Sequence, residues 1–109
     1  MVVISVADFL QKARAFAKPD RQTERALAAR MRQGDADARQ QLLQGYLPQV
    51  AAAVRRAPQH IQTLELVMRC RQTLARAADM FDFSQDGETF THRLSICLRQ
   101  TVVGYLAQR

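Results

Sequence analysis

Residues 27–57 read LAARMRQGDADARQQLLQGYLPQVAAAVRRA, and this stretch decides the fold class. Its apolar residues recur every three or four positions, which is the spacing of one helix face. Gly34 can end one helix and Asp35 can cap the next, because glycine tolerates the left-handed conformation and aspartate accepts N–H bonds from a first turn. Pro48 lacks a backbone donor, so we expect the helix that starts at Asp35 to kink or restart there.

The chain before this stretch predicts two helices. Ser5 and Asp8 form a capping box for a helix that reaches about Lys18, and Pro19 ends it because the residue before a proline avoids helical dihedral angles. Asp20 then caps a second helix that closes at Gly34.

The chain after the stretch predicts two more helices, one over residues 64–81 and one from residue 90 onward, separated by a polar turn over 83–88. The buried side of the first is expected to carry Leu64, Val67, Met68, Leu74, Ala77, Ala78 and Phe81. The core-facing side of the second is expected to carry Leu94, Leu98, Thr101 and Tyr105. No strand-like alternation appears, so we predict an all-α protein: a single domain over residues 1–109, built as a compact bundle of about five helices.

The composition indicates which classes of partner the chain could bind. The net charge is +6 and most basic residues are arginines, which favours polyanions or acidic protein surfaces. Arginine and glutamine enrichment from a GC-rich genome is an equally good explanation. Cys70 and Cys97 have no metal-ligand spacing and are expected to be buried, reduced thiols. No stretch is long enough for a signal peptide or a membrane span, so we expect a cytoplasmic protein with no membrane partner.

No constellation supports catalysis. His60 and His92 are far apart in the sequence, so they do not predict a metal-binding pair. The turn around Asp82, Ser84 and Asp86 resembles the opening of a calcium loop, but the twelfth position, where a bidentate glutamate is needed, is Arg93. We therefore expect no catalytic residue, no metal and no cofactor, and we interpret the acidic residues of this turn as solvated. The chain is not expected to be an enzyme.

Two segments, residues 27–57 and 64–107, resemble regions 1.2 and 2 of the sigma-70 family of RNA polymerase sigma factors. Residues 27–57 resemble its helix, Gly-Asp turn and second helix with a basic tail. Residues 64–82, LELVMRCRQTLARAADMFD, resemble the family stretch that reads roughly DLIQEGNIGLMRAVEKFD. Residues 89–107, TFTHRLSICLRQTVVGYLA, resemble the promoter-recognition helix, and residues 6–33 match region 1.2. The resemblance covers nearly the whole chain, in order, and implies the fold of sigma region 2.

The resemblance also implies two binding surfaces. Residues 65–75 would dock on the clamp helices of the largest RNA polymerase subunit, and the candidates there are Glu65, Met68, Arg69, Arg71 and Ala75. The last helix would contact the −10 promoter element through the face that carries Arg93, Ile96, Cys97, Gln100 and Val103. Phosphate contacts would come from Arg55, Arg56, Arg93 and Arg99, and Gln100 would reach a base edge. Ordinary solvation of surface arginines is the alternative for each of them.

The departures from the family fall on these surfaces. Housekeeping relatives carry aromatic residues where Arg93, Ile96 and Cys97 stand, and a base stacked on an aromatic ring gains roughly 1–3 kcal/mol. Strand opening of the housekeeping type should therefore be weaker. Met68, Arg69 and Arg71 replace a polar and acidic set. The 109 residues hold no counterpart of the −35-binding domain.

Two functions follow as hypotheses. The first is a sigma-like transcription initiation protein that binds RNA polymerase, −10 promoter DNA, or both. The second is a degenerate sigma fold that acts as a regulatory interaction module without melting promoters. Its partner would be an anti-sigma factor, a subunit that supplies the missing domain, or a second copy of the chain. Ile96 and Val103 favour the second hypothesis, because they lie off the core-facing side of their helix.

Overall fold

A computed structural model describes residues 2–108, and this part of the chain contains helices and no strand. The elements are α1 (Val6–Ala13), α2 (Arg21–Arg32), α3 (Ala36–Gly45), α4 (Leu47–Arg56), the short 3₁₀ helix η1 (Gln59–Ile61), α5 (Leu64–Met80) and α6 (Phe90–Ala107). The all-α prediction is confirmed. Among the described residues, no helix combines the length and apolarity that a membrane crossing requires.

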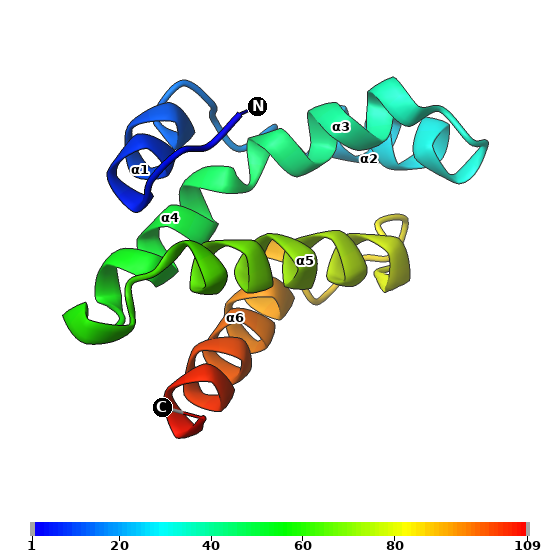
Figure 1. Cartoon of the computed structure of the whole chain (residues 1–109). Coiled ribbons are helices and arrows are strands. Elements are labelled where there is room, and N and C mark those ends of the chain that lie inside the picture. The colour runs from blue at the N-terminus through cyan, green and yellow to red at the C-terminus, as the bar shows by residue number, and fades with distance from the viewer. Residues whose placement is uncertain (1, 109) are drawn as a thin grey trace.

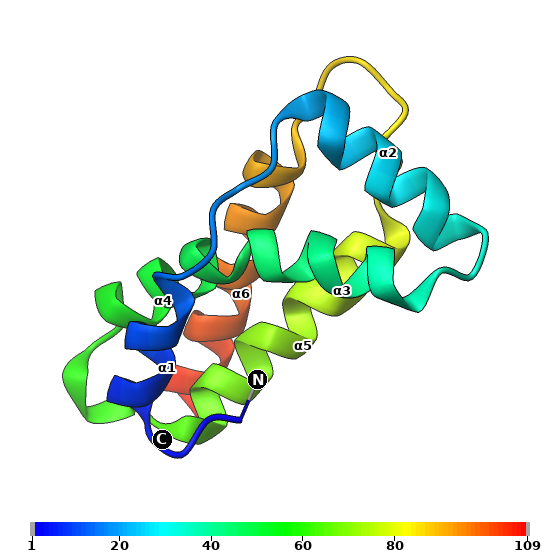
Figure 2. The ribbon, with the colours of Figure 1, turned by 90° about the horizontal axis from the view of Figure 1, so that it is seen from above.

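The helices form two linked groups (Figures 1 and 2). The α2 and α3 helices pack against each other as one pair, and α3 continues into α4 through a bend. The α4, α5 and α6 helices pack together as the second group, with α1 against α4. Figure 1 shows α6 crossing α5 at an angle on its way to the C-terminus, and Tyr105 near the end of α6 is still buried against α5. Because only part of its circumference is covered, α6 presents a long face to solvent.

Aromatic rings fill the core where the second group meets the loop between α5 and α6. Phe90 lies 1% exposed at the start of α6, and its ring centroid is 4.8 Å from that of Tyr46, 5.3 Å from Phe81 and 5.0 Å from Phe83. Edge and tilted arrangements of this kind are the favoured geometry of aromatic pairs. Phe81 and Phe83 both lie in the loop and are buried, so two aromatic side chains hold this otherwise polar loop against the core.

The predicted turn between α2 and α3 is confirmed. Gly34 has φ +93°, the left-handed conformation, and its N–H donates to the Met31 carbonyl at 3.0 Å. The Asp35 N–H reaches back to the Arg30 carbonyl at 3.1 Å, which completes a Schellman motif. The Asp35 carboxylate then caps α3 by accepting the Ala38 N–H at 3.0 Å.

The chain restarts at Pro48, as expected. Tyr46 closes α3 with φ −103° and ψ 0°, and Pro48 occupies the first turn of α4, where its missing N–H has no intrahelical partner to lose. The prediction for the first helix was too long, because α1 ends at Ala13 and not near Lys18. The segment after α1 instead crosses α3 closely, with Pro19 lying against Gly45.

The buried face of α5 agrees with the prediction at Val67, Leu74 and Ala78 and differs from it at the start of the helix. Leu64 is 39% exposed and Met68 is 59% exposed, whereas Leu66 and Cys70 are fully buried. Apolar residues at four of the first five positions of α5 make the phase of the buried face ambiguous in sequence. The neighbours α4 and α6 select the face of Leu66 and Cys70. Cys70 is buried as expected, but Cys97 is only half-buried, and both are free thiols.

Gly45 provides a test of the crossing beside Pro19. A Cβ at this position would lie 2.6 Å from Pro19 Cδ, so we expect Gly45→Ala to lower the free energy of unfolding by roughly 1–3 kcal/mol through overpacking. Gly104→Ala is the matched control, because nothing lies within 4 Å of its added Cβ and helix propensity should raise stability by about 0.5–1 kcal/mol. Urea unfolding followed by circular dichroism measures both. Equal stabilisation by the two changes would contradict the packing.

Candidate nucleic-acid interface

The exposed face of α6 carries the polar residues that the sequence singled out. Thr89 caps the helix by accepting the His92 N–H at 3.1 Å. Phe90, Leu94 and Leu98 then anchor one side in the core. The opposite side is solvent-exposed and consists of His92, Arg93, Ile96, Arg99, Gln100 and Val103. Cys97, which was grouped with this face, is half-buried at its edge.

Two of the predicted phosphate-binding arginines share a groove between α4 and α6. Arg56, in the last turn of α4, and Arg99 of α6 both line it. The groove has a volume of about 350 Å³. We call it the α4/α6 groove; its lining is Gln49, Ala53, Arg56, Ala57, Pro58, Ser95, Leu98, Arg99, Val102, Val103 and Leu106. Arg55 is not part of it, because it borders a separate hollow with Leu10 and Arg14 of the α1 segment.

Arg93 and Gln100 open onto the other side of α6. Together with Arg76 and Cys97 they line a hollow of about 640 Å³ between α6 and the C-terminal half of α5. The predicted DNA-contacting residues therefore straddle the α6 ridge. Arg99 faces the α4 side, and Arg93 and Gln100 face the α5 side.

The arginines of this surface differ in how they are neutralised. Glu88 holds Arg93, with the shortest N–O distance at 2.7 Å, and this hydrogen bonding lowers the pKa of Glu88 from its usual value. Within residues 2–108, Arg55, Arg56 and Arg99 make no ion pair with a carboxylate. Positive charge is therefore uncompensated at the α4/α6 groove and partly compensated at Arg93.

The predicted polymerase-docking residues also divide into two sets. Glu65 and Arg69 form an ion pair at 3.1 Å on the side of α5 that faces Tyr105. The Arg69 guanidinium lies 5.1 Å from the centroid of the Tyr105 ring, and the Tyr105 hydroxyl donates to Glu65 at 3.1 Å. These two side chains tie α5 to α6.

The remaining docking residues line a second groove. Met68, Arg71 and Ala75 of α5 border a groove of about 470 Å³ against Leu43 and Leu47. We call this the α3/α5 groove. Met68 is the most exposed of the apolar residues named for this groove, so a partner helix could contact it directly.

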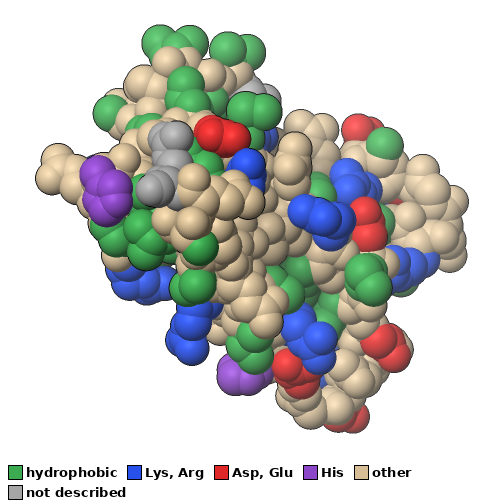
Figure 3. Space-filling view, turned by 60° about the horizontal axis from the view of Figure 1, so that its bottom comes forward, with side chains coloured by type: hydrophobic (Ala, Val, Ile, Leu, Met, Phe, Trp, Pro, Cys, Tyr) green, Lys and Arg blue, Asp and Glu red, His purple; other side chains and the backbone are tan. Residues whose placement is uncertain are grey.

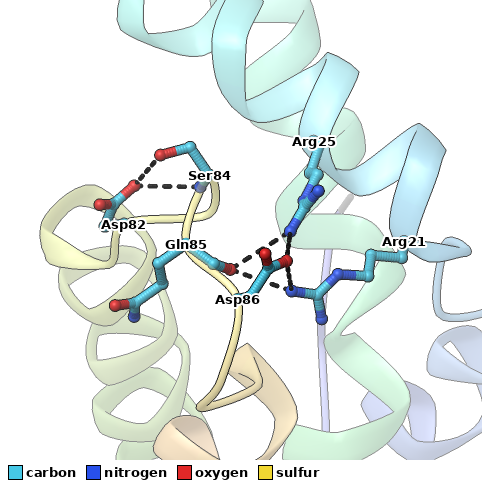
Figure 4. Close-up of polar contacts among 6 residues, drawn as sticks. All are labelled: Arg21, Arg25, Asp82, Ser84, Gln85 and Asp86. Carbon is cyan, nitrogen blue, oxygen red and sulfur yellow. Dashed lines mark hydrogen bonds and ion pairs between the residues drawn. The ribbon is translucent and has the colours of Figure 1, made fainter.

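The loop between α5 and α6 is fastened to α2 by arginines, as Figure 4 shows. The Asp86 carboxylate lies between Arg25, at 2.8 Å, and Arg21, at 3.6 Å. The Gln85 carbonyl accepts hydrogen bonds from the same two guanidinium groups at 3.3 and 2.9 Å. Asp82 is occupied locally, since it accepts both the N–H and the hydroxyl of Ser84.

The acidic residues of this turn are solvated, as interpreted, since Asp79, Asp82 and Asp86 are exposed, but most of them also pair with arginines. Asp79 pairs with Arg39 at 3.0 Å, and Asp86 and Glu88 have arginine partners of their own. The signal that sequence reading could have used is the pair Arg21 and Arg25, one helical turn apart on α2. Their partners lie sixty or more positions away, so spacing alone could not identify them. Among the described residues, no cluster of histidine, cysteine or acidic side chains could hold a metal ion.

These pairs predict the direction of the pH dependence. Hydrogen bonds from Arg39 lower the pKa of Asp79 below its ordinary value of 3.8, and backbone or side-chain donors lower those of Asp35 and Asp86 likewise. A carboxyl whose pKa is lower in the folded state stabilises the fold above its unfolded pKa, and this stabilisation is lost as the pH falls through the folded pKa. We expect Tm to be flat from pH 7 to about 5 and to fall below about 4. Asp79→Asn should lower Tm at neutral pH and flatten the acid limb. A Tm that rises on acidification would contradict this assignment.

Comparison of the chain with protein-family models, with curated proteins and with solved structures gives no match.

Proposed function

We propose that this protein is a sigma-factor-like transcription initiation protein that binds bacterial RNA polymerase and −10 promoter DNA. One observation supports this best. Arg56 and Arg99 line the same groove at the edge of the exposed α6 face, and neither has a carboxylate partner within residues 2–108. Arginine forks of this kind bind phosphate oxygens, and DNA presents phosphates in a continuous row.

In this proposal α6 is the DNA-contacting element. Arg56 and Arg99 hold the backbone on the α4 side of the ridge. Gln100 is exposed on the α5 side, where an amide can bond a base edge. Arg93 contributes less, because Glu88 already neutralises it. Without aromatic rings at positions 93, 96 and 97, the expected activity is binding to the promoter rather than housekeeping-type strand opening.

Polymerase binding is assigned to the α3/α5 groove. Met68, Arg71 and Ala75 face the same groove, whereas Glu65 and Arg69 are engaged beside Tyr105. The proposed docking surface for polymerase therefore consists of Met68, Arg71 and Ala75. A cytoplasmic location belongs to the same proposal, since bacterial transcription takes place there, and no catalytic reaction is assigned to the chain.

The test measures both interactions at low ionic strength. Fluorescence anisotropy with a forked, −10-containing DNA should give binding that weakens steeply with salt, because each neutralised phosphate contributes about −0.9 to the slope of log K against log salt. Purified core RNA polymerase should bind the chain in a parallel assay. A scrambled DNA of equal length reports sequence preference. If the chain bound tightly to neither polymerase nor DNA, the proposal would be overturned.

A further inference from the structure

The α4/α6 groove joins two properties that bound DNA alone does not explain. Its rim holds Arg56 and Arg99, and no aspartate or glutamate lines it. Its floor and far edge are apolar, with Leu98 at the bottom and Val102, Val103 and Leu106 along α6. Val103 is 59% exposed and Leu106 is 39% exposed, so this apolar edge is open to solvent.

Covering an exposed apolar edge of this kind removes apolar surface from water, which is favourable in free energy. Phosphate groups would satisfy the arginines but would leave Val103 and Leu106 in water. Figure 3 shows Lys and Arg side chains standing beside hydrophobic ones on the face where α6 comes forward. A second copy of the chain fits poorly, because two chains that each carry a charge of +6 repel. The occupant should be apolar on one side and negatively charged beside it.

We propose that the α4/α6 groove binds an acidic amphipathic helix of a partner protein. The eleven steps along α6 from Ser95 to Leu106 span about 17 Å at ~1.5 Å per residue, which matches about three turns of a docked helix. Apolar residues at positions i, i+3, i+4 and i+7 would cover Val102, Val103 and Leu106, as in other helix-in-groove complexes. Acidic residues that flank this stripe would pair with Arg56 and Arg99.

The proposal has a regulatory consequence. Arg56 and Arg99 are also the phosphate-binding residues of the proposed function, so the acidic helix and DNA would exclude each other. This consequence rests on the proposed function, whereas binding of the helix itself does not.

The experiment uses the full chain and a designed probe. The probe is a fluorescent, capped peptide of about 14 residues with leucines on one helical face and glutamates beside them. One control peptide scrambles the same residues, and the other replaces each glutamate by lysine. We expect the probe to bind with micromolar affinity and both controls to bind at least tenfold more weakly. A probe that does not bind, or a scrambled peptide that binds equally well, would overturn the proposal.

Variants locate the site. Leu106→Gln and Arg56→Gln should each weaken the probe about tenfold, which corresponds to about 1.4 kcal/mol. Arg76→Gln is the matched control, because Arg76 is exposed on α5, outside the α4/α6 groove. Circular dichroism confirms that each variant is folded. Equal weakening by Arg76→Gln would show a general charge effect and would overturn the assignment to the groove.

The DNA assay separates this inference from the proposed function. Leu106→Gln should weaken the peptide about tenfold and change DNA affinity much less, because it removes apolar surface and no charge. A chain that binds the peptide at the groove but binds neither DNA nor polymerase would support the groove and contradict the proposed function. A chain that binds DNA but not the peptide would support the proposed function and contradict the peptide-binding groove.

Discussion

Replacing Arg56 and Arg99 together by glutamate should weaken binding to −10 DNA by about a hundredfold or more at low salt. Each change removes one phosphate contact and adds a charge that repels the next phosphate. Two lost contacts should also reduce the slope of log K against log salt by about two. Both side chains are exposed and form no ion pair within the described chain, so their loss should leave the fold intact.

A second double variant controls for net charge. Arg14 and Arg71 also lack a carboxylate partner among residues 2–108 and lie away from the α4/α6 groove. Reversing both changes the total charge by the same amount. We expect only a several-fold loss of DNA affinity from this control in the anisotropy assay. If the two double variants lost affinity equally, the DNA would be held by the overall charge and not by the groove.

Phe90→Ala should lower the free energy of unfolding by about 3–5 kcal/mol, because it removes a large side chain from the centre of the aromatic core. Phe90 is 1% exposed and its ring meets those of Tyr46, Phe81 and Phe83. The loss is a large part of the stability of a domain of this size.

Urea denaturation followed by circular dichroism measures this change. Met80→Ala is the control, since Met80 is 87% exposed and its truncation should alter stability by no more than about 0.5 kcal/mol. A Phe90→Ala effect as small as that of the control would show that the rings do not form a shared core.

The features of the fold that the sequence predicted are those set by neighbouring residues. Asp20 and Asp35 cap their helices, Gly34 takes the left-handed conformation, and Pro48 opens a new helix. In each case the side chain or ring acts on backbone groups within a few positions. Local chemistry of this kind leaves few alternatives.

The features that sequence reading missed depend on contacts between distant segments. No local pattern indicates that α1 ends at Ala13 or that Pro19 lies against Gly45. The buried face of α5 was misplaced at Met68, because apolar residues crowd both sides of its first turns.

The sequence predicted which residues belong to the candidate site, but it did not predict how their side chains pair. The outward position of Ile96, Gln100 and Val103 agrees with the expected face of the last helix. The pairing of Arg93 with Glu88, and the division of the docking residues by the contact of Arg69 with Tyr105, required the packed structure. The charge of a surface can be counted from sequence, but its neutralisation depends on which side chains meet.

Competition for purified core polymerase tests most directly the proposal that this chain binds RNA polymerase as an initiation factor does. The chain should bind core polymerase, a housekeeping sigma factor should displace it, and Met68→Asp should weaken the complex at least tenfold. Failure to bind core polymerase, or simultaneous binding of both proteins without displacement, would contradict the claim.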